Sequence, residues 1–224
     1  MPTPYNKAGP PDIAKSTSIV TIIVKEQKHI VHKELICFYS PFFDKAFNGA
    51  FIEGSTQEIK LEEVELELFG IFVNFIYTQS LRKTDENGKE VYMTLVDVVS
   101  LWGLAEQWLC KRLQDKIILE IGALPLANTT VAKNKNDLIS ASRAAFRHDK
   151  DKVLQDAIVS KVVNTAGTYP EELESWTNLY PMSMLQQLFK KQRSFYDAKI
   201  STMQMTIHDL HTELDEITGS DYDW

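Results

Sequence analysis

The chain has 224 residues, of which 44% are hydrophobic and 25% charged, an ordinary globular composition with room for one or two domains. Its 24 Lys and Arg against 31 Asp and Glu give a formal charge of -7, and this acidic balance argues against a nucleic-acid-binding surface, which needs clustered cations. No run approaches the roughly 18 apolar residues of a transmembrane helix, and no signal peptide opens the chain. We therefore expect an intracellular protein, of the cytoplasm or the nucleus, without membrane contact.

Short strands and helices alternate in the first part of the chain. Residues 1–17 are rich in Pro, Gly, Lys and Ser, which predicts a disordered lead. The β-branched run Ile19–Val24 and the apolar pair Ile30–Val31, separated by a polar turn, predict two adjacent strands. A helix is expected from Lys33, and Pro41 suits the first turn of a second helix because its missing N–H is not needed there.

A polar loop follows this helical hairpin. Gly49 ends the second helix, and we expect Glu53–Gln57 to be a loop that leads to Glu58–Glu62, whose period-two alternation predicts a strand. The spacing becomes helical from Glu65, and its wide apolar arc predicts a deeply packed helix that ends near Thr78.

The next segment predicts a turn and two more helices. Ser80–Lys89 is polar and turn-rich, which predicts an exposed loop or a hairpin tip. Thr94, with Asp97 at the third helical position, predicts a helix start close to a capping box. A further helix is predicted by the apolar positions Leu109, Leu113, Ile117 and Ile121.

Residues 18–122, read in this order, resemble a BTB/POZ domain. The resemblance is carried by the string HKELICFYSPFF, the Phe51-Ile52-Glu53 loop, the strand EIKLEE and the helix ending FIYTQSL. It is similar above all to the stand-alone BTB proteins common in fungi. It implies an α+β fold, a small β-sheet with a cluster of α-helices, followed in this chain by an all-α extension. Such domains serve protein association with themselves, with transcriptional co-regulators or with cullin-type ubiquitin ligases.

Two residues of the loop can be carried over from cullin-binding BTB adaptors. In those proteins the loop carries an apolar residue, any residue and then Glu, and Phe51 and Glu53 fit this pattern. The apolar side chain would enter a pocket on the cullin while the carboxylate accepts hydrogen bonds at its rim. The alternative is that Phe51 covers the domain's own core and that Glu53 is merely solvated.

The resemblance also has departures. Transcription-factor BTB domains pair a buried Asp in the first strand with a basic residue after the hairpin's aromatic pair, and here Ile19 and Asp44 stand at those positions. This argues against co-repressor recruitment through that pocket. The lead also lacks the amphipathic helix that long-form BTB dimers exchange. A homodimer through the BTB domain or through the last helix stays open.

Residues 123–166 predict a helical extension. The polar run Asn128–Asn136 is expected to be a linker or capping loop, and two amphipathic helices follow it, around Leu138–Phe146 and Val153–Val162. In cullin-binding adaptors a helix pair at this place extends the docking groove. The alternative is that these helices only close the domain's exposed apolar face.

Residues 167–224 predict a break, a long helix and a frayed acidic tail. Pro181 opens the helix, in which apolar residues recur at spacings of three and four. A coiled-coil partner, such as a second copy, and packing back onto the chain's own domain are both compatible with this seam. Its strongest positions are Ile200, Met203, Ile207, Leu210, Leu214 and Ile217.

No catalytic, metal or cofactor motif is found, so we expect a non-enzymatic interaction module without a cofactor. His208 and His211 share a helix face but lack further ligands, which favours solvated side chains. We expect Cys37 and Cys110 to be buried free thiols and His32 to have a structural role. Two functions follow: a substrate adaptor of a cullin-RING ubiquitin ligase, or a homo-oligomeric scaffold or transcription-associated regulator without cullin binding.

Overall fold

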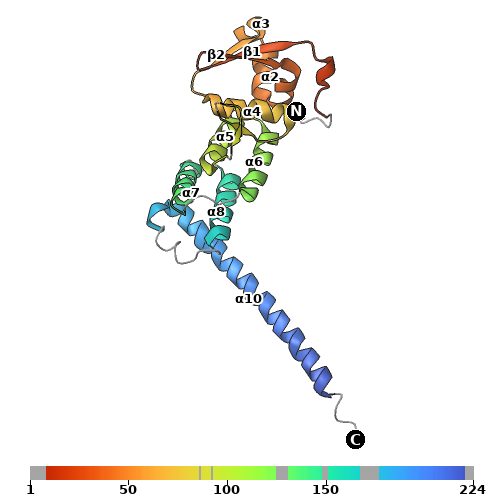
Figure 1. The fold of residues 1–224 in the computed structure, drawn as a ribbon, viewed down its shortest axis with the longest axis vertical. Helices are drawn as coiled ribbons and strands as arrows, with labels where there is room; N and C mark the ends of the chain where they lie inside the picture. The colour runs from red at the N-terminus through yellow and green to blue at the C-terminus, as the bar shows by residue number, and fades with distance from the viewer. Residues whose placement is uncertain are drawn as a thin grey trace. The chain divides into compact units, whose positions relative to one another are not determined.

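The computed structural model describes residues 9–85, 87–91, 93–124, 131–147, 151–166 and 177–219. The chain divides into two units, Met1–Ala144 and Ala145–Trp224, whose folds are seen in Figure 1. Three predictions fall in whole or in part outside the described residues. They are most of the disordered lead, the break at 167–170 and the frayed tail at 220–224.

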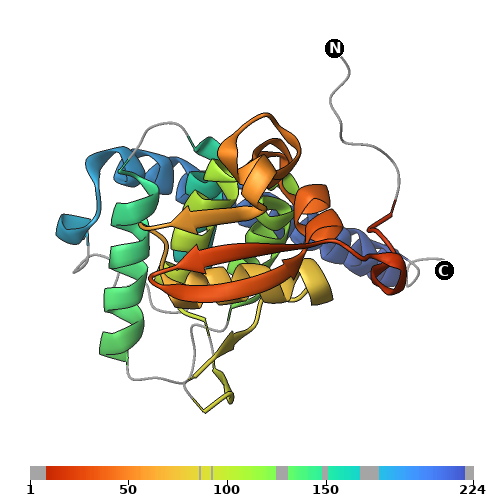
Figure 2. The same ribbon diagram turned by 90° about the horizontal axis from the view of Figure 1, so that it is seen from above.

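A three-stranded sheet lies in the first unit, with the strands side by side in the order β2-β1-β3 (Figure 2). The central strand β1, Ile19–Val24, pairs antiparallel with β2, Gln27–His32, and parallel with β3, Glu58–Leu61. The β1–β2 connection has Lys25 and Glu26 at φ 45° and 72°, the left-handed conformation that a tight hairpin turn requires. The predicted strands are confirmed.

Seven helices of the first unit are described. A short 3-10 turn, η1, comes before the sheet at Ile13–Lys15, and a small hairpin is formed by β4, Lys83–Thr84, and β5, Glu90–Val91. The helices are α1 Lys33–Tyr39, α2 Pro41–Asn48, α3 Ile52–Thr56, α4 Leu66–Thr78, α5 Leu95–Gln107, α6 Lys111–Ala123 and α7 Val131–Ala145.

Two predicted loops are helical in the structure. Of the polar loop expected at Glu53–Gln57, residues 53–56 lie in α3, and Gln57 ends this helix with a left-handed φ of 53°. The expected linker at 128–136 is helical from Val131 onward. Its polarity does not break a helix, since the segment contains neither Gly nor Pro.

The core of the first unit is rich in aromatic rings. Phe43 and Phe72 both pack on Trp108, with ring centroids 5.3 and 4.7 Å away, and all three side chains are fully buried. Phe69 contributes a further edge-on contact to Trp108 at 6.2 Å. These rings come from α2, from α4 and from the turn between α5 and α6, so the hairpin of α1 and α2 is anchored in the centre of the unit.

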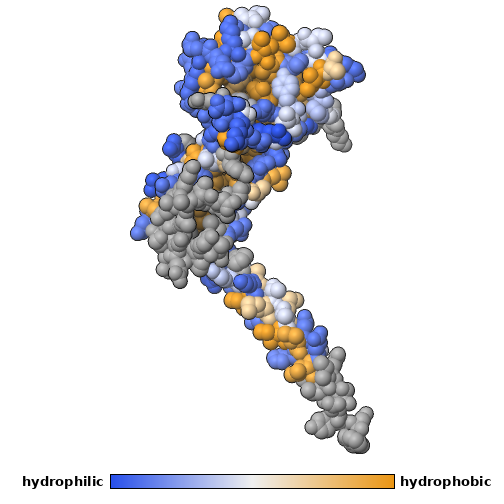
Figure 3. Space-filling model, viewed as in Figure 1, coloured by the Kyte–Doolittle hydropathy of each residue, from blue (hydrophilic) through white to orange (hydrophobic). Residues whose placement is uncertain are grey.

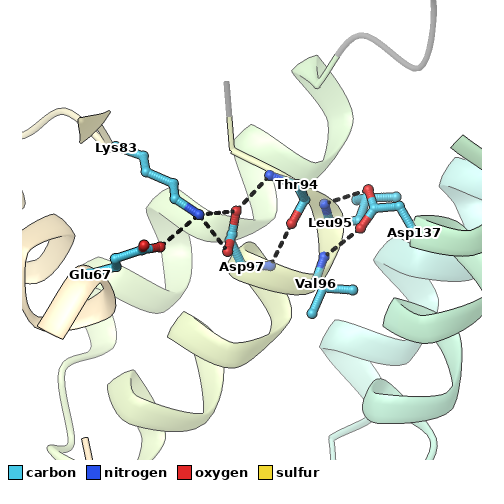
Figure 4. Close-up of polar contacts among 7 residues, drawn as sticks. All are labelled: Glu67, Lys83, Thr94, Leu95, Val96, Asp97 and Asp137. Atoms are coloured by element: carbon cyan, nitrogen blue, oxygen red, sulfur yellow. Dashed lines mark hydrogen bonds and ion pairs between the residues drawn. The ribbon is translucent and has the colours of Figure 1, made fainter. Parts of the chain in front are cut away.

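A polar network holds the start of α5 (Figure 4). The capping box is confirmed: Thr94 accepts from the Asp97 N–H at 3.1 Å, and Asp97 accepts from the Thr94 N–H at 2.9 Å. Lys83 donates to both Asp97 oxygens, at 3.1 and 3.2 Å, and pairs with Glu67 at 2.9 Å. Asp137 of α7 accepts the next backbone N–H groups of α5, from Leu95 at 2.8 Å and from Val96 at 3.1 Å.

The second unit contains α8, Lys152–Ala166, a 3-10 turn η2, Thr177–Leu179, and the long helix α10, Met182–Gly219. The first turns of α10 pack against α8, with Met184 and Leu188 fully buried. Lys191 then pairs with Asp156 at 2.5 Å and donates to Ser160 Oγ at 2.6 Å. Beyond that point α10 runs well past α8 (Figure 1). An α+β part followed by a helical carboxyl-terminal region is thus the confirmed fold class.

Candidate functional site

Phe51 and Glu53 lie at the start of α3, directly after the helical hairpin. Phe51 is the residue that precedes the first turn of α3, and its side chain is 63% exposed, so it does not cover the domain's own core. Ile52 beside it is 73% exposed. Glu53 is half-buried in the first turn of the helix. The structure therefore brings two exposed apolar side chains next to one carboxylate, within three consecutive residues.

Glycines hold this segment close to α2. A Cβ atom added at Gly54 would lie 2.3 Å from the carbonyl oxygen of Gly49, and one added at Gly49 would lie 2.3 Å from that of Lys45. Such distances are far below van der Waals contact, so both positions need glycine for the close approach of the backbone. The Gly54 N–H also donates to the Phe51 carbonyl at 3.0 Å.

Gln57 closes the other end of α3. Its side-chain amide donates to the carbonyl oxygens of Phe47, at 3.1 Å, and Gly54, at 2.5 Å. Its backbone N–H donates to the Glu53 carbonyl at 2.8 Å. Lys33 of α1 reaches the same Phe47 carbonyl at 3.1 Å. The end of α2 and the whole of α3 are thereby joined into one hydrogen-bonded segment that presents Phe51 and Ile52 outward.

The second candidate surface is the predicted seam on α10. Six apolar side chains at heptad spacing, here called the α10 stripe, are each between 45% and 58% exposed: Tyr196, Ile200, Met203, Ile207, Leu210 and Leu214. Figure 3 shows hydrophobic side chains gathered along this helix. The side chain of Ile217, the last predicted seam position, lies outside those described. Such a row of large exposed apolar residues marks an interaction surface in a soluble protein.

Neither candidate surface has the chemistry of a catalytic or metal site. No group of three or more His, Cys, Asp or Glu within the described part of the chain could hold a metal ion. His208 and His211 are exposed on α10. None of the described helices is long and apolar enough to cross a membrane.

The two cysteines are free, as predicted, although only Cys110 is fully buried and Cys37 is half-buried. Burial raises the pKa of the Cys110 thiol to about 11. Burial, with the nearby carboxylate of Asp44, raises the pKa of the Cys37 thiol to about 12. Both thiols are therefore held in the protonated, unreactive form.

The structure also shows the surroundings of His32, Ile19 and Asp44, for which the sequence makes predictions. His32 bonds through Nδ1 to the Tyr77 hydroxyl at 2.7 Å, which fits the structural role expected for it. Ile19 is 58% exposed, and Asp44 is exposed and accepts from the Asn48 amide at 2.8 Å. Neither occupies a buried charged pocket.

Sequence reasoning missed the contribution of Ile52. It treated this position as unconstrained, but Ile52 is more exposed than Phe51 and lies beside it. The available signal was a bulky apolar pair set in an otherwise polar segment that precedes a strand. The apolar contact surface at this site thus includes Ile52 as well as Phe51.

Comparison with known proteins agrees with the topology. The model of the BTB/POZ domain family matches residues 14–116. The limits predicted from the sequence are 18–122. Among solved structures, the BTB (Tramtrack and Bric a brac) domain of human gigaxonin is similar, with 20% sequence identity over 44% of this chain and 72% of that one. Its TM-score is 0.33.

Curated relatives are Kelch-like proteins at low identity. Kelch-like protein 30 of Mus musculus is 35% identical over 68 residues, which is 30% of this chain and 12% of that protein. Kelch-like protein 40b of Danio rerio is 25% identical over 119 residues, 51% of this chain and 19% of that protein. The chain thus spans less than a fifth of the length of these relatives. Residues 14–116 of the chain thus match a BTB/POZ domain, which is a protein–protein interaction module.

Proposed function

We propose that this protein is a non-enzymatic substrate adaptor of a cullin-RING ubiquitin ligase, of the stand-alone BTB kind, and that it binds the cullin through Phe51 and Glu53. The observation that carries the proposal is the exposure of Phe51, at 63%, directly beside Glu53 on α3. BTB domains are typically non-catalytic interaction modules, and the relatives named above are Kelch-like proteins.

The chemistry of the segment suits a small interaction hot spot. An aromatic ring that is largely exposed in the free protein contributes most to binding when it enters a pocket and loses its water. Ile52, at 73% exposure, adds apolar area next to the ring. The carboxylate of Glu53 can accept hydrogen bonds at the edge of the same contact, where it stays partly solvated and orients the complex.

Under this proposal, each part of the chain would have its own role. The BTB domain would dock the cullin, and the helical extension, residues 123–166, would support it. Residues 167–224, with the α10 stripe, would offer a second protein-binding surface.

A binding titration tests the proposal. The full chain is titrated with the amino-terminal domain of the cullin, and wild type is compared with Phe51→Ala and Glu53→Ala. We expect micromolar or tighter binding by the wild type and a loss of about 30-fold for Phe51→Ala, the size of a hot-spot residue. The loss for Glu53→Ala should be smaller, because its contact lies at the rim.

Matched substitutions control for general effects. Ile30→Ala removes an apolar side chain on β2 that is 68% exposed, and Glu63→Ala removes an exposed carboxylate after β3. Both should leave the affinity unchanged. An absence of binding by the wild type up to roughly 50 μM, or equal losses for Ile30→Ala and Phe51→Ala, would contradict the proposal.

A second candidate function is a homo-oligomeric scaffold that binds no cullin. The α10 stripe favours it, because these side chains are about half exposed in a single copy. Light scattering of the full chain tests it, with Ile207→Glu as the disruptive variant. Met205→Glu is the matched control, since Met205 lies off the stripe and is 67% exposed. We expect an oligomer for wild type and Met205→Glu, and a monomer for Ile207→Glu. A monomeric wild type would contradict the scaffold.

A further inference from the structure

We infer that α10 pairs with α10 of a second copy in an antiparallel coiled coil whose two-fold axis crosses the seam midway between Met203 and Ile207. The inference rests on the second candidate function, self-association, and specifies its geometry. The stripe runs from Tyr196 to Leu214, about 27 Å of helix at about 1.5 Å per residue.

The apolar positions match one another in this register. A heptad has two apolar seam positions, a and d. In an antiparallel coil, an a residue of one helix packs against a d residue of the other helix. With the axis midway between Met203 and Ile207, every residue of the α10 stripe meets another residue of the stripe. The facing pairs are Tyr196 with Leu214, Ile200 with Leu210, and Met203 with Ile207, each formed twice by symmetry.

The flanking charges match as well. In an antiparallel coil, the residues that flank the seam on one side of a helix face residues at the same heptad position of the second copy. In this register Lys199 faces Glu213 of the second copy, and both are exposed in one copy. On the other flank Asp197 faces His211 of the second copy. Asp197 already forms a long ion pair with Arg193 of its own helix, at 3.9 Å, so the Lys199–Glu213 pair is the clearer signal.

A parallel coil would fit the same helix less well. Equivalent seam residues face each other in a parallel dimer, which would set Arg193 against Arg193 of the second copy at the first layer. Like charges so placed oppose association. In the antiparallel register, Arg193 instead falls at the end of the coil, opposite Ile217 of the second copy. The parallel flanks would also leave Lys199 opposite Gln204 and Glu213 opposite Thr218, without charge pairing.

Reversing the charges tests the orientation in the full chain. The dimer dissociation constant is measured by sedimentation for wild type, Lys199→Glu, Glu213→Lys and the double variant. Each single change replaces two attractive pairs by two repulsive ones, which should weaken the dimer by about tenfold at low salt. The double variant should regain wild-type affinity to within about twofold, because its charges are again complementary. Salt at about 1 M should remove the difference.

The control is Asp209→Lys, a charge reversal on the same helix at a position that faces away from the apolar seam. It should leave the dissociation constant unchanged, and circular dichroism checks that every variant keeps its helix. If neither single change raises the dissociation constant, the antiparallel orientation is wrong, but self-association still holds. A wild-type chain that stays monomeric would overturn both. Neither result bears on cullin binding through Phe51.

Discussion

The Ser40 hydroxyl donates a hydrogen bond to the carbonyl oxygen of Trp108 at 2.7 Å, and both residues are fully buried although they are 68 positions apart. The same hydroxyl accepts from the Phe43 N–H at 3.3 Å and so begins α2. One oxygen therefore ties the turn between α1 and α2 to the turn between α5 and α6. This bond fixes the hairpin that ends at the candidate site against the aromatic core.

Replacing Ser40 by Ala should destabilise the protein by about 1–3 kcal/mol, because a buried carbonyl and a buried N–H both lose their partner. Urea unfolding measures the change, which should appear as a lower midpoint with an unchanged slope. Ser100→Ala, at an exposed position of α5, is the control and should lie within about 0.5 kcal/mol of wild type. Equal stabilities for the two variants would refute the role assigned to Ser40.

Asp137 should matter to a helix other than its own. Its two carboxylate oxygens accept the N–H groups of Leu95 and Val96 at the start of α5. Asp137→Ala leaves these donors without a partner and removes a negative charge from a helix amino terminus, so we expect a loss of about 1–2 kcal/mol. Asp137→Asn keeps an acceptor and should lose less. Hydrogen exchange at Leu95 and Val96 should speed up in the Ala variant, and unchanged exchange there would disprove the contact.

His29 should make the protein less stable in mild acid. Its ring packs edge-on to Phe69 with centroids 4.9 Å apart, and burial lowers its pKa below the ordinary value of 6.5. The unfolded chain therefore binds a proton at a pH where the folded one does not. Stability is full above about pH 6.5 and is lost as the pH falls through the pKa of the folded state.

Urea midpoints between about pH 8 and pH 5 measure this effect. His29→Gln cannot be protonated and should show a shallower fall than wild type. His208→Gln, at an exposed position of α10, is the matched control and should follow the wild type. A wild-type slope that survives in His29→Gln would show that other groups cause it.

The thiols should be inert in the folded protein. With pKa values of about 11 for Cys110 and about 12 for Cys37, almost no thiolate is present at neutral pH. A colorimetric thiol reagent at about pH 8 should titrate almost none in the native protein and both cysteines after unfolding. Rapid native reaction of one equivalent would show that Cys37, which is half-buried, is more accessible than its surroundings imply.

Much of the fold could be predicted because local signals and tertiary packing agree. The β-branched run of β1, the Ser40-Pro41 start of α2 and the Thr94 capping box each specify one conformation on their own. Each of these elements is present as predicted. The apolar stripe on α10 could also be predicted from the sequence. Apolar residues that recur every three and four positions lie on one face of a helix, whatever the distant contacts are.

The differences arise where a distant contact decides. Helix α3 contains Gly, Ser and Thr, which favour a loop, and it is closed instead by Gln57 bonding back to Phe47. Asp137 caps α5 from 42 positions away, a relationship that no local pattern contains. The exposure of Phe51 and Ile52 depends in the same way on packing that the sequence does not reveal.

The close approach at Gly49 and Gly54 bears on how a partner would be bound. A hypothetical Cβ at either glycine would lie 2.3 Å from the opposing carbonyl, so this arrangement of the backbone around Phe51 requires glycine at both positions. The conformational entropy of this segment is lost when the chain folds, so association would lose little more and the ring would arrive preorganised. Gly54→Ala, which adds one methyl group away from the exposed face, would then weaken a complex as a contact substitution does.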